Sequence, residues 1–211
     1  MRCIDRPLDG YACQVSTVTV QDELLRTVVK VAAGLREANI RFALTGGCAA
    51  YARGGPATEH DVDVLVRECD VDAAVRALVA AGMRPQEPPE DWLTKVYDGD
   101  RLVDLLFRPN ERPVTDEVLD RAEDLQVGSI VVPVQTATDV LIGKLLVLGP
   151  HRCDFSDAMD VARALREQID WPVVAAEAAG SPYVEAFLLL VHRLEVAPGL
   201  VTPVRLHKEP A

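Results

Sequence analysis

Two aspartates lie one residue apart in the otherwise apolar segment DVDVLV, at residues 61–66. In a β-strand, residues two apart point to the same side, so Asp61 and Asp63 share one face while Val62 and Val64 enter the core. Two carboxylates held this close repel each other unless a positive charge lies between them. A divalent cation supplies that charge, and oxygen ligands favour Mg²⁺ or Mn²⁺ over zinc. The alternative is that both aspartates lie at the exposed mouth of the strand and cap the following turn.

A third carboxylate interrupts the apolar segment RLVDLLF at residues 101–107. Alternation places Asp104 on an otherwise apolar strand face, where a buried and unpaired carboxylate costs several kcal/mol. If this segment lies beside residues 61–66, the carboxylates of Asp61, Asp63 and Asp104 converge. That arrangement matches two-metal phosphoryl transfer, in which one ion activates the attacking oxygen and the other holds a triphosphate.

Residues suited to binding phosphate lie on either side of these carboxylates in the chain. Gly46 and Gly47 fall between an expected strand and an expected helix, where glycines let backbone N–H groups approach a phosphate. A Gly-Gly pair is also often only a tight turn. Thr45, just before it, offers a hydroxyl. Lysine is rare in this chain, and Lys144 lies in the nearly apolar segment VLIGKLLVLG, which favours a buried anion such as phosphate as its partner. The alternative is that its ammonium group extends to the surface.

Charged residues follow this lysine in the segment HRCDFSDAMD, at residues 151–160. Arg152 is a further candidate for contact with the nucleotide. Asp157 and Asp160 are three residues apart and therefore share one face of an expected helix. That face is either solvated or turned toward the site, where it would orient Lys144 or the nucleotide.

Hydrophobic periodicity predicts an α/β or α+β fold, with mixed strands and helices first and helices last. A brief helix is expected after Gly47, Thr136 is expected to cap a helix, and Pro85, Pro88 and Pro89 are expected to mark a loop. The other expected helices cover residues 20–38, 71–82, 115–123, 136–148, 155–168, 171–179 and 183–195. The expected strands cover residues 40–45 and 61–66, and two hairpins cover 92–108 and 125–134.

This order of elements divides the chain into four parts. We expect an N-terminal arm (1–19), an α/β lobe (20–134), a helical C-terminal lobe (135–197) and an irregular tail (198–211).

The composition restricts the partners of the protein. The formal net charge is −11, so a nucleic acid would need a local basic face rather than general attraction. The five cysteines are scattered without a Cys-x-x-Cys pair, and neither a signal peptide nor a long apolar run is found, so we expect reduced thiols, a cytoplasmic location and no membrane partner. The arginines that would have to form a basic face are Arg101, Arg108, Arg112, Arg152, Arg193 and Arg205.

Taken together, these motifs resemble the polymerase-β-type nucleotidyltransferase superfamily. Its signature is Gly-Gly or Gly-Ser, a short helix, Asp-x-Asp and a third Asp on a later strand. Gly46-Gly47, Asp61 with Asp63, and Asp104 match that signature. The pattern VxTxxDVLIGKLLxL, with the arginine and aspartates after it, is similar to the AbiEii-type branch, the nucleotidyltransferase toxins of bacterial toxin–antitoxin pairs.

The resemblance implies the transfer of a nucleoside monophosphate from an NTP, such as ATP, to an acceptor hydroxyl, with pyrophosphate leaving. It implies that Asp61 and Asp63 bind the metals, that Asp104 completes the cage and accepts the proton of the acceptor, and that Gly46, Gly47 and Lys144 hold the triphosphate. Lys144 and Asp157 match two additional active-site residues of the toxin branch, with Asp160 the competing choice.

One departure from the family concerns the loop before Asp61. Many relatives carry an arginine a few residues before Asp-x-Asp, whereas this chain has Glu59 and His60 there. His60 is therefore a candidate contact for phosphate, and the base preference is left open.

Three functions compete. The leading hypothesis is a toxin that adds nucleotides to RNA, at a tRNA acceptor end, and is silenced by an antitoxin protein. The second is a nucleotidyltransferase that modifies a small molecule, similar to the aminoglycoside-modifying enzymes, because an acidic cleft suits a cationic drug. The third is a catalytically silent binding module with the same fold, which predicts that no divalent ion binds.

Overall fold

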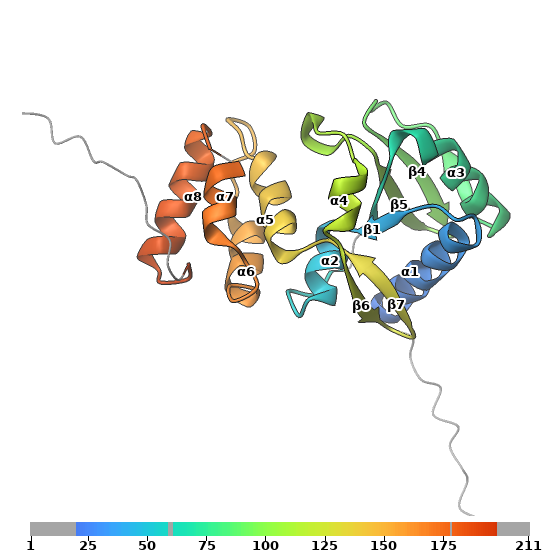
Figure 1. Ribbon diagram of the computed structural model, residues 1–211, viewed down its shortest axis with the longest axis horizontal. Helices are drawn as coiled ribbons and strands as arrows, with labels where there is room; N and C mark the ends of the chain where they lie inside the picture. The colour runs from blue at the N-terminus through green and yellow to red at the C-terminus, as the bar shows by residue number, and fades with distance from the viewer. Residues whose placement is uncertain (1–19, 59–60, 178, 198–211) are drawn as a thin grey trace, which may run out of the picture.

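The computed structural model describes residues 20–58, 61–177 and 179–197 (Figure 1). Its centre is a seven-stranded mixed sheet with the strand order β3-β4-β5-β2-β1-β7-β6. The β1–β7 and β2–β5 pairs are parallel, and the other neighbouring strands are antiparallel. The strands are β1 (Phe42–Leu44), β2 (Val62–Val66), β3 (Arg84–Gln86), β4 (Leu93–Asp98), β5 (Arg101–Leu106), β6 (Glu123–Val127) and β7 (Ile130–Val134).

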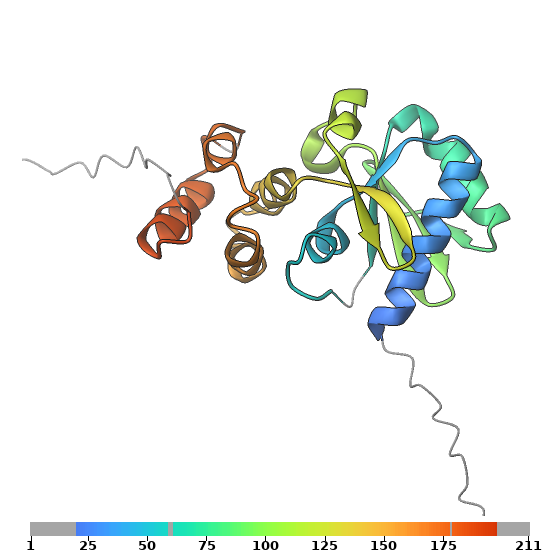
Figure 2. The same ribbon diagram turned by 60° about the horizontal axis from the view of Figure 1, so that its bottom comes forward.

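Helices cover both faces of this sheet. On one side α1 and α3 pack against each other, and the buried β2 side chains of Val62, Val64 and Val66 belong to the same apolar cluster (Figure 2). On the other side a smaller cluster joins Leu65 to Leu119 of α4. These helices are α1 (Val20–Glu37), α2 (Gly46–Ala52), α3 (Val71–Ala80) and α4 (Asp116–Asp120), with short 3₁₀ turns η1 (Glu68–Asp70) and η2 (Pro109–Glu111).

The chain after β7 is helical and lies beside the sheet (Figure 1). Helix α5 contacts α2, α6 and α7, so it connects the helices to the sheet region. Its first turn is capped by Thr136, whose hydroxyl accepts a hydrogen bond from the backbone N–H of Asp139 at 3.1 Å. The helices are α5 (Ala137–Leu146), α6 (Ser156–Ala164), α7 (Trp171–Glu177) and α8 (Pro182–Arg193).

The predicted fold class is confirmed: a mixed sheet with helices is followed by helices alone. Several local predictions were wrong, among them the helix expected at 155–168, which ends at Ala164. Pro85, expected in a loop, lies in β3, which is an edge strand and therefore tolerates a missing N–H donor. The helix expected at 115–123 ends at Asp120, because β6 already begins at Glu123.

The predicted division into lobes stays a prediction, and the arm and the tail lie outside the described residues. One buried apolar cluster includes residues from both α1 and α8. Within the described ranges, Cys48, Cys69 and Cys153 form no disulfide, and no helix combines the length and the apolar character required to cross a bilayer.

Candidate active site

The three carboxylates identified in the sequence meet on the sheet. Strands β2 and β5 run parallel with Asp63 opposite Asp104, and Asp61 lies immediately before β2. One carboxylate oxygen from each of these residues lies within 4.8 Å of the other two. Oxygens on opposite sides of a Mg²⁺ ion are about 4 Å apart, so the three side chains fit a shared ion after a small movement.

The electrostatics of this cluster favour a bound cation. Burial, followed by the charges of Asp61 and Asp104, raises the pKa of Asp63 from 3.8 to about 7. Burial also raises the pKa of Asp104, whereas the ammonium group of Lys95 opposes that rise. Because Lys95 and Lys144 only partly balance the negative charge, a divalent ion would stabilise the ionised carboxylates.

Lys95 lies opposite Asp104 across the β4–β5 hairpin. Its Nζ is 3.7 Å from Oδ1 of Asp104, which is too long for a hydrogen bond. This Oδ1 is buried and has no hydrogen-bond partner in the part of the chain that the structure describes. A buried carboxylate oxygen without a donor is costly, so the position suits a ligand or an ion that the protein alone does not provide.

The two glycines allow the start of α2 to approach the carboxylates. Gly46 has a φ of +59°, and a Cβ atom built there would lie 2.0 Å from Oδ2 of Asp63. A Cβ on Gly47 would lie 2.6 Å from Oγ1 of Thr58. A side chain at either position would therefore force the site to shift, and at Gly46 the left-handed backbone adds strain.

The residues on either side of this glycine pair are held by the core. The N–H of Thr45 donates to the carbonyl of Asp63 at 3.0 Å, and its hydroxyl donates to Oε1 of Gln135. Cys48 is buried, and burial, followed by the charge of Asp63, raises the pKa of its thiol to about 12. The Cys48 thiol is therefore not a nucleophile at neutral pH.

A pocket of about 820 Å³ lies between this end of the sheet and α5. Asp63 and Gly46 line it from the sheet side, and Lys144 lines it from α5. We call it the lysine pocket. Its other lining residues are Thr45, Asp91, Trp92, Leu106, Arg108, Pro109, Asn110, Glu111, Val140, Gly143, Val147 and Arg152.

The structure brings most of the predicted nucleotide contacts into this one pocket. Thr45, Gly46, Lys144 and Arg152 all line it. Oδ2 of Asp157 lies 3.9 Å from Nζ of Lys144, although the carboxylate is largely exposed. No contact between Asp160 and Lys144 is found in the described ranges, and Asp160 is exposed, so Asp157 is the aspartate next to the lysine. Gly47 packs on Thr58 instead of lining the pocket, and His60 lies outside the described residues.

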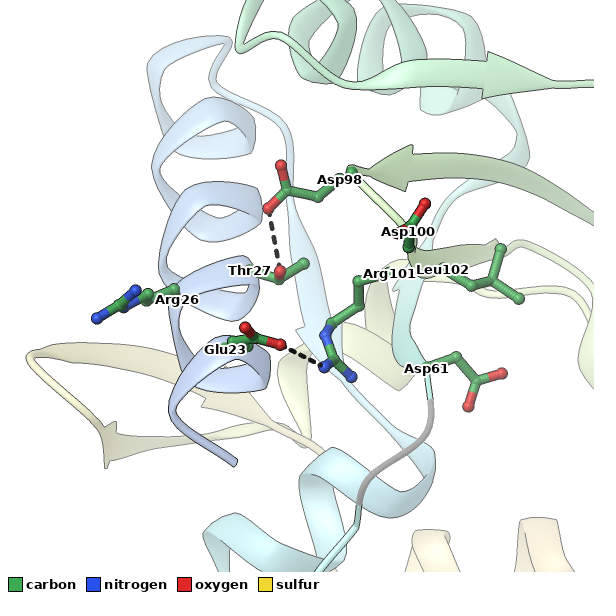
Figure 3. Close-up of a pocket in the computed structure, with 9 residues that line it drawn as sticks. Glu23, Arg26, Thr27, Asp61, Asp98, Asp100, Arg101 and Leu102 are labelled. Carbon is green, nitrogen blue, oxygen red and sulfur yellow. Dashed lines mark hydrogen bonds and ion pairs between the residues drawn. The ribbon is translucent and has the colours of Figure 1, made fainter. Parts of the chain in front are cut away.

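A second pocket, also of about 820 Å³, opens beside Asp61 (Figure 3). We call it the acidic pocket, because Glu23, Asp61, Asp98 and Asp100 line it together with Arg101. The remaining lining residues are Arg26, Thr27, Gly99 and Leu102, and in Figure 3 the Arg26 side chain points away from Asp61.

Three interactions tie α1 to this pocket. Asp98 accepts hydrogen bonds from Thr27, at 3.0 Å, and from Lys30. Arg101 lies 3.7 Å from the carboxylate of Glu23, and in Figure 3 its guanidinium is between Glu23 and Asp61. The β4–β5 turn and α1 therefore form one wall next to the metal-binding candidates.

The arginines considered for a basic face are dispersed. Arg108 and Arg152 line the lysine pocket, whereas Arg101 lines the acidic pocket. Arg112 pairs with Glu177 on α7, at 3.1 Å. Arg193 is in the last turn of α8, and Arg205 lies outside the described residues.

Several residues at the site were not among those predicted from the sequence. Lys95 could have been found by counting back from the Asp98-Gly99-Asp100 turn, since this places it opposite Asp104. Glu23 and Trp92 carried no comparable signal, because only the packing of distant segments brings them to the pockets.

A mixed sheet that presents three convergent carboxylates beside a strand–Gly-Gly–helix turn is the arrangement that the resemblance to nucleotidyltransferases implied. Residues 12–196 match the family described as "uncharacterised nucleotidyltransferase", so the chain belongs to this family and is a nucleotidyltransferase. No curated protein sequence matches the chain. The AbiEii-type branch stays a prediction.

Solved structures share this fold. The solution structure of the antibiotic-resistance factor ANT(2'')-Ia has a TM-score of 0.60 at 17% identity, covering 83% of this chain and 98% of that one. The crystal structure of ANT(2'')-Ia with adenylyl-2''-tobramycin has a TM-score of 0.54 at 17% identity, covering 77% and 98%. The Megavirus polyadenylate synthase is more distant, with a TM-score of 0.47 at 15% identity, covering 74% of this chain and 33% of that one.

Proposed function

We propose that the protein transfers a nucleoside monophosphate from an NTP to an acceptor hydroxyl, with pyrophosphate as the leaving group. The observation that carries the proposal is the convergence of Asp61, Asp63 and Asp104 within 4.8 Å, with one buried oxygen of Asp104 unpartnered in the described ranges. These carboxylates would hold Mg²⁺ or Mn²⁺, which supplies charge neutralisation and Lewis-acid activation at the reacting phosphate.

Asp104 is the candidate for proton transfer. Its carboxylate would accept the proton of the acceptor hydroxyl. The hydroxyl oxygen then bonds to the α-phosphorus, the bond from that phosphorus to the bridging oxygen breaks, and the electron pair leaves with pyrophosphate. The buried position of Asp104 beside Lys95 would hold its side chain in one orientation during this step.

Lys144 and Arg152 are the candidates for holding the triphosphate. Both line the pocket that also contains Asp63, so their charges lie on the nucleotide side of the carboxylates. Asp157, 3.9 Å from the Lys144 ammonium, would orient that lysine. The N–H groups of Gly46 and Gly47 would add neutral contacts, whereas the hydroxyl of Thr45 already donates its proton to Gln135.

For the acceptor, the charge of the acidic pocket favours a small molecule that carries ammonium groups. Glu23, Asp61, Asp98 and Asp100 line this pocket, so its four carboxylates outnumber the two arginines, Arg26 and Arg101, that also line it. ANT(2'')-Ia, an antibiotic-resistance factor seen with adenylyl-2''-tobramycin, has the same fold. Fold likeness alone does not transfer a substrate, so the proposal rests on the pocket charges.

RNA is the second candidate acceptor, with the protein acting as the toxin of a toxin–antitoxin pair on a tRNA acceptor end. One observation favours it: two of the six arginines considered for an RNA-binding face, Arg108 and Arg152, line the lysine pocket. The acidic pocket and the net charge of −11 oppose it.

The test supplies purified protein with each α-labelled NTP, Mg²⁺ or Mn²⁺, and either total tRNA or a panel of aminoglycosides and other polyamine-bearing alcohols. We expect label on a small cationic acceptor and release of pyrophosphate. Asp104→Asn should abolish both the labelling and the release of pyrophosphate. Asp124→Asn, which changes an exposed aspartate on β6, should abolish neither. Label on tRNA instead would support the toxin. Failure to bind any divalent ion in calorimetry would support the catalytically silent module and overturn the proposal.

A further inference from the structure

Two exposed apolar side chains face the same pocket. Trp92 is 36% exposed and Val147 is 38% exposed, and both line the lysine pocket. Single exposed apolar residues are ordinary on protein surfaces, but exposed apolar groups gathered in a charged pocket mark a binding position. The pocket therefore offers apolar surface that phosphate groups would not use.

The backbone fixes Trp92 at the end of β5. Its carbonyl accepts hydrogen bonds from the N–H groups of Phe107 and Arg108, each at 3.1 Å. Leu93, the next residue, pairs with Leu106 in the β4–β5 ladder. Trp92 is therefore held in a set relation to the strand that carries Asp104.

Val147 is held on the opposite wall by α5. It follows Lys144 by three residues, and Val140 precedes that lysine by four, so the three side chains share one helix face. The side chain of Asn110 donates to the carbonyl of Gly143 at 3.4 Å and joins the sheet-side wall to α5. Asp91 and Arg108 form an ion pair at 2.8 Å beside Trp92.

The spacing along β5 suits a nucleotide. Asp104 and Leu106 point to the same side of the strand, and two residues span about 7 Å. Leu106 lines the lysine pocket, and so does Trp92, the residue before Leu93, which is the ladder partner of Leu106. A ribose thus has room between a phosphate at the carboxylates and a base at Trp92.

We propose that the nucleobase of the bound NTP stacks on the indole of Trp92, with Val147 covering its other side. Lys144 and Arg152 then hold the triphosphate at the inner end of the same pocket. This inference rests on the proposed nucleotidyl transfer and adds the residue that distinguishes a nucleotide from a bare polyphosphate. Stacking of a base on an aromatic side chain tolerates every base, so all four NTPs gain from it.

The two tryptophans of the chain allow a test that does not depend on activity. Trp171 is 2% exposed in the core, so a ligand in the lysine pocket should alter only the fluorescence of Trp92. We expect NTP with Mg²⁺ to quench the emission of the unaltered protein and of Trp171→Phe, and not of Trp92→Phe. Inorganic tripolyphosphate with Mg²⁺ should bind without quenching. Equal quenching of Trp92→Phe and the unaltered protein would overturn the proposal.

Calorimetry provides the second measurement. Trp92→Ala should raise the Kd for NTP by about 5- to 100-fold and leave the Kd for tripolyphosphate unchanged. Leu194→Ala, which removes an exposed apolar side chain after α8, should change neither. An equal loss for both ligands would assign Trp92 a structural role and overturn the inference, and so would an unchanged Kd for NTP. If NTP with Mg²⁺ does not bind the unaltered protein, the proposed function itself fails.

Discussion

The two pockets beside the carboxylates have similar volumes, about 820 Å³ each, but differ in the balance of the charges that line them. The lysine pocket combines the cations of Lys144 and Arg152 with exposed apolar side chains, whereas the acidic pocket is lined by Glu23, Asp98 and Asp100. Asp63 belongs to the first and Asp61 to the second. Under the proposed function, the carboxylates would separate an anionic donor from a cationic acceptor.

The largest expected loss of activity comes from substituting a carboxylate that lies between the two pockets. Asp63→Asn should lower transfer by about 10³-fold with every acceptor, since removing a metal ligand forfeits several kcal/mol of transition-state stabilisation. Initial rates at saturating Mg²⁺ measure this. Asp124→Asn on β6 is the matched control, and full activity of the Asp63 variant would exclude a catalytic role for the site.

Gly46→Ala should come next, because the new Cβ would lie 2.0 Å from Oδ2 of Asp63. We expect an activity loss of about 100-fold and a loss of about 1–3 kcal/mol in the free energy of unfolding. Gly54→Ala separates the two causes: Gly54 also has a positive φ, +88°, but no atom lies within 4 Å of its built Cβ. It should lose stability and retain activity; equal activity losses would point to backbone strain alone.

Lys144→Met should affect only the donor side of the comparison. The KM for NTP is expected to rise by about 10- to 100-fold, the range for losing a charged hydrogen bond, with the KM of the acceptor unchanged. Asp157→Asn should also raise the KM for NTP, but by a smaller factor, because the carboxylate of Asp157 is largely exposed. A raised KM for the acceptor would instead place the lysine between the two substrates.

The metal-free protein should lose stability as the pH rises. The pKa of Asp63 is about 7 when folded against 3.8 ordinarily, so the folded state binds more protons between these values. The contribution of Asp63 is therefore complete below about pH 4 and is lost as the pH approaches 7. Urea unfolding at pH 5 and pH 8 in EDTA measures this. Asp63→Asn should reduce the difference, and Mg²⁺ should restore stability at pH 8.

The smallest expected effect is on the KM of the acceptor, after a substitution in the acidic pocket. Asp100→Asn should raise the KM for a cationic acceptor by about 2- to 5-fold, as expected for an exposed charge pair, and leave the KM for NTP unchanged. Higher salt should reduce the difference between the variant and the unaltered protein. An effect confined to NTP would reverse the assignment of the pockets.

The carboxylate cluster was predictable because it depends on local rules. Strand alternation gave the faces of Asp61, Asp63 and Asp104. The prediction assumed that the two segments lie side by side, and they do so as the parallel pair β2–β5. The confirmed fold class likewise followed from hydrophobic periodicity and turn residues.

The rest of the site depends on packing between distant segments. The acidic pocket exists because α1 docks on the β4–β5 turn through Thr27 and Asp98, a contact across 71 residues. The Thr45 hydroxyl was predicted to be available to a ligand, but its proton is donated to Gln135, 90 residues away. No periodicity or motif in one sequence encodes such pairings.

Asp63 and Asp104 belong to adjacent strands of one sheet and Asp61 immediately precedes β2, whereas Lys144 belongs to α5 and Val147 is the C-cap residue of that helix. A rotation of the helices against the sheet would widen or narrow the nucleotide-binding space without changing the distances between the carboxylates. Loading of the ion and release of the product would then be governed by different parts of the molecule.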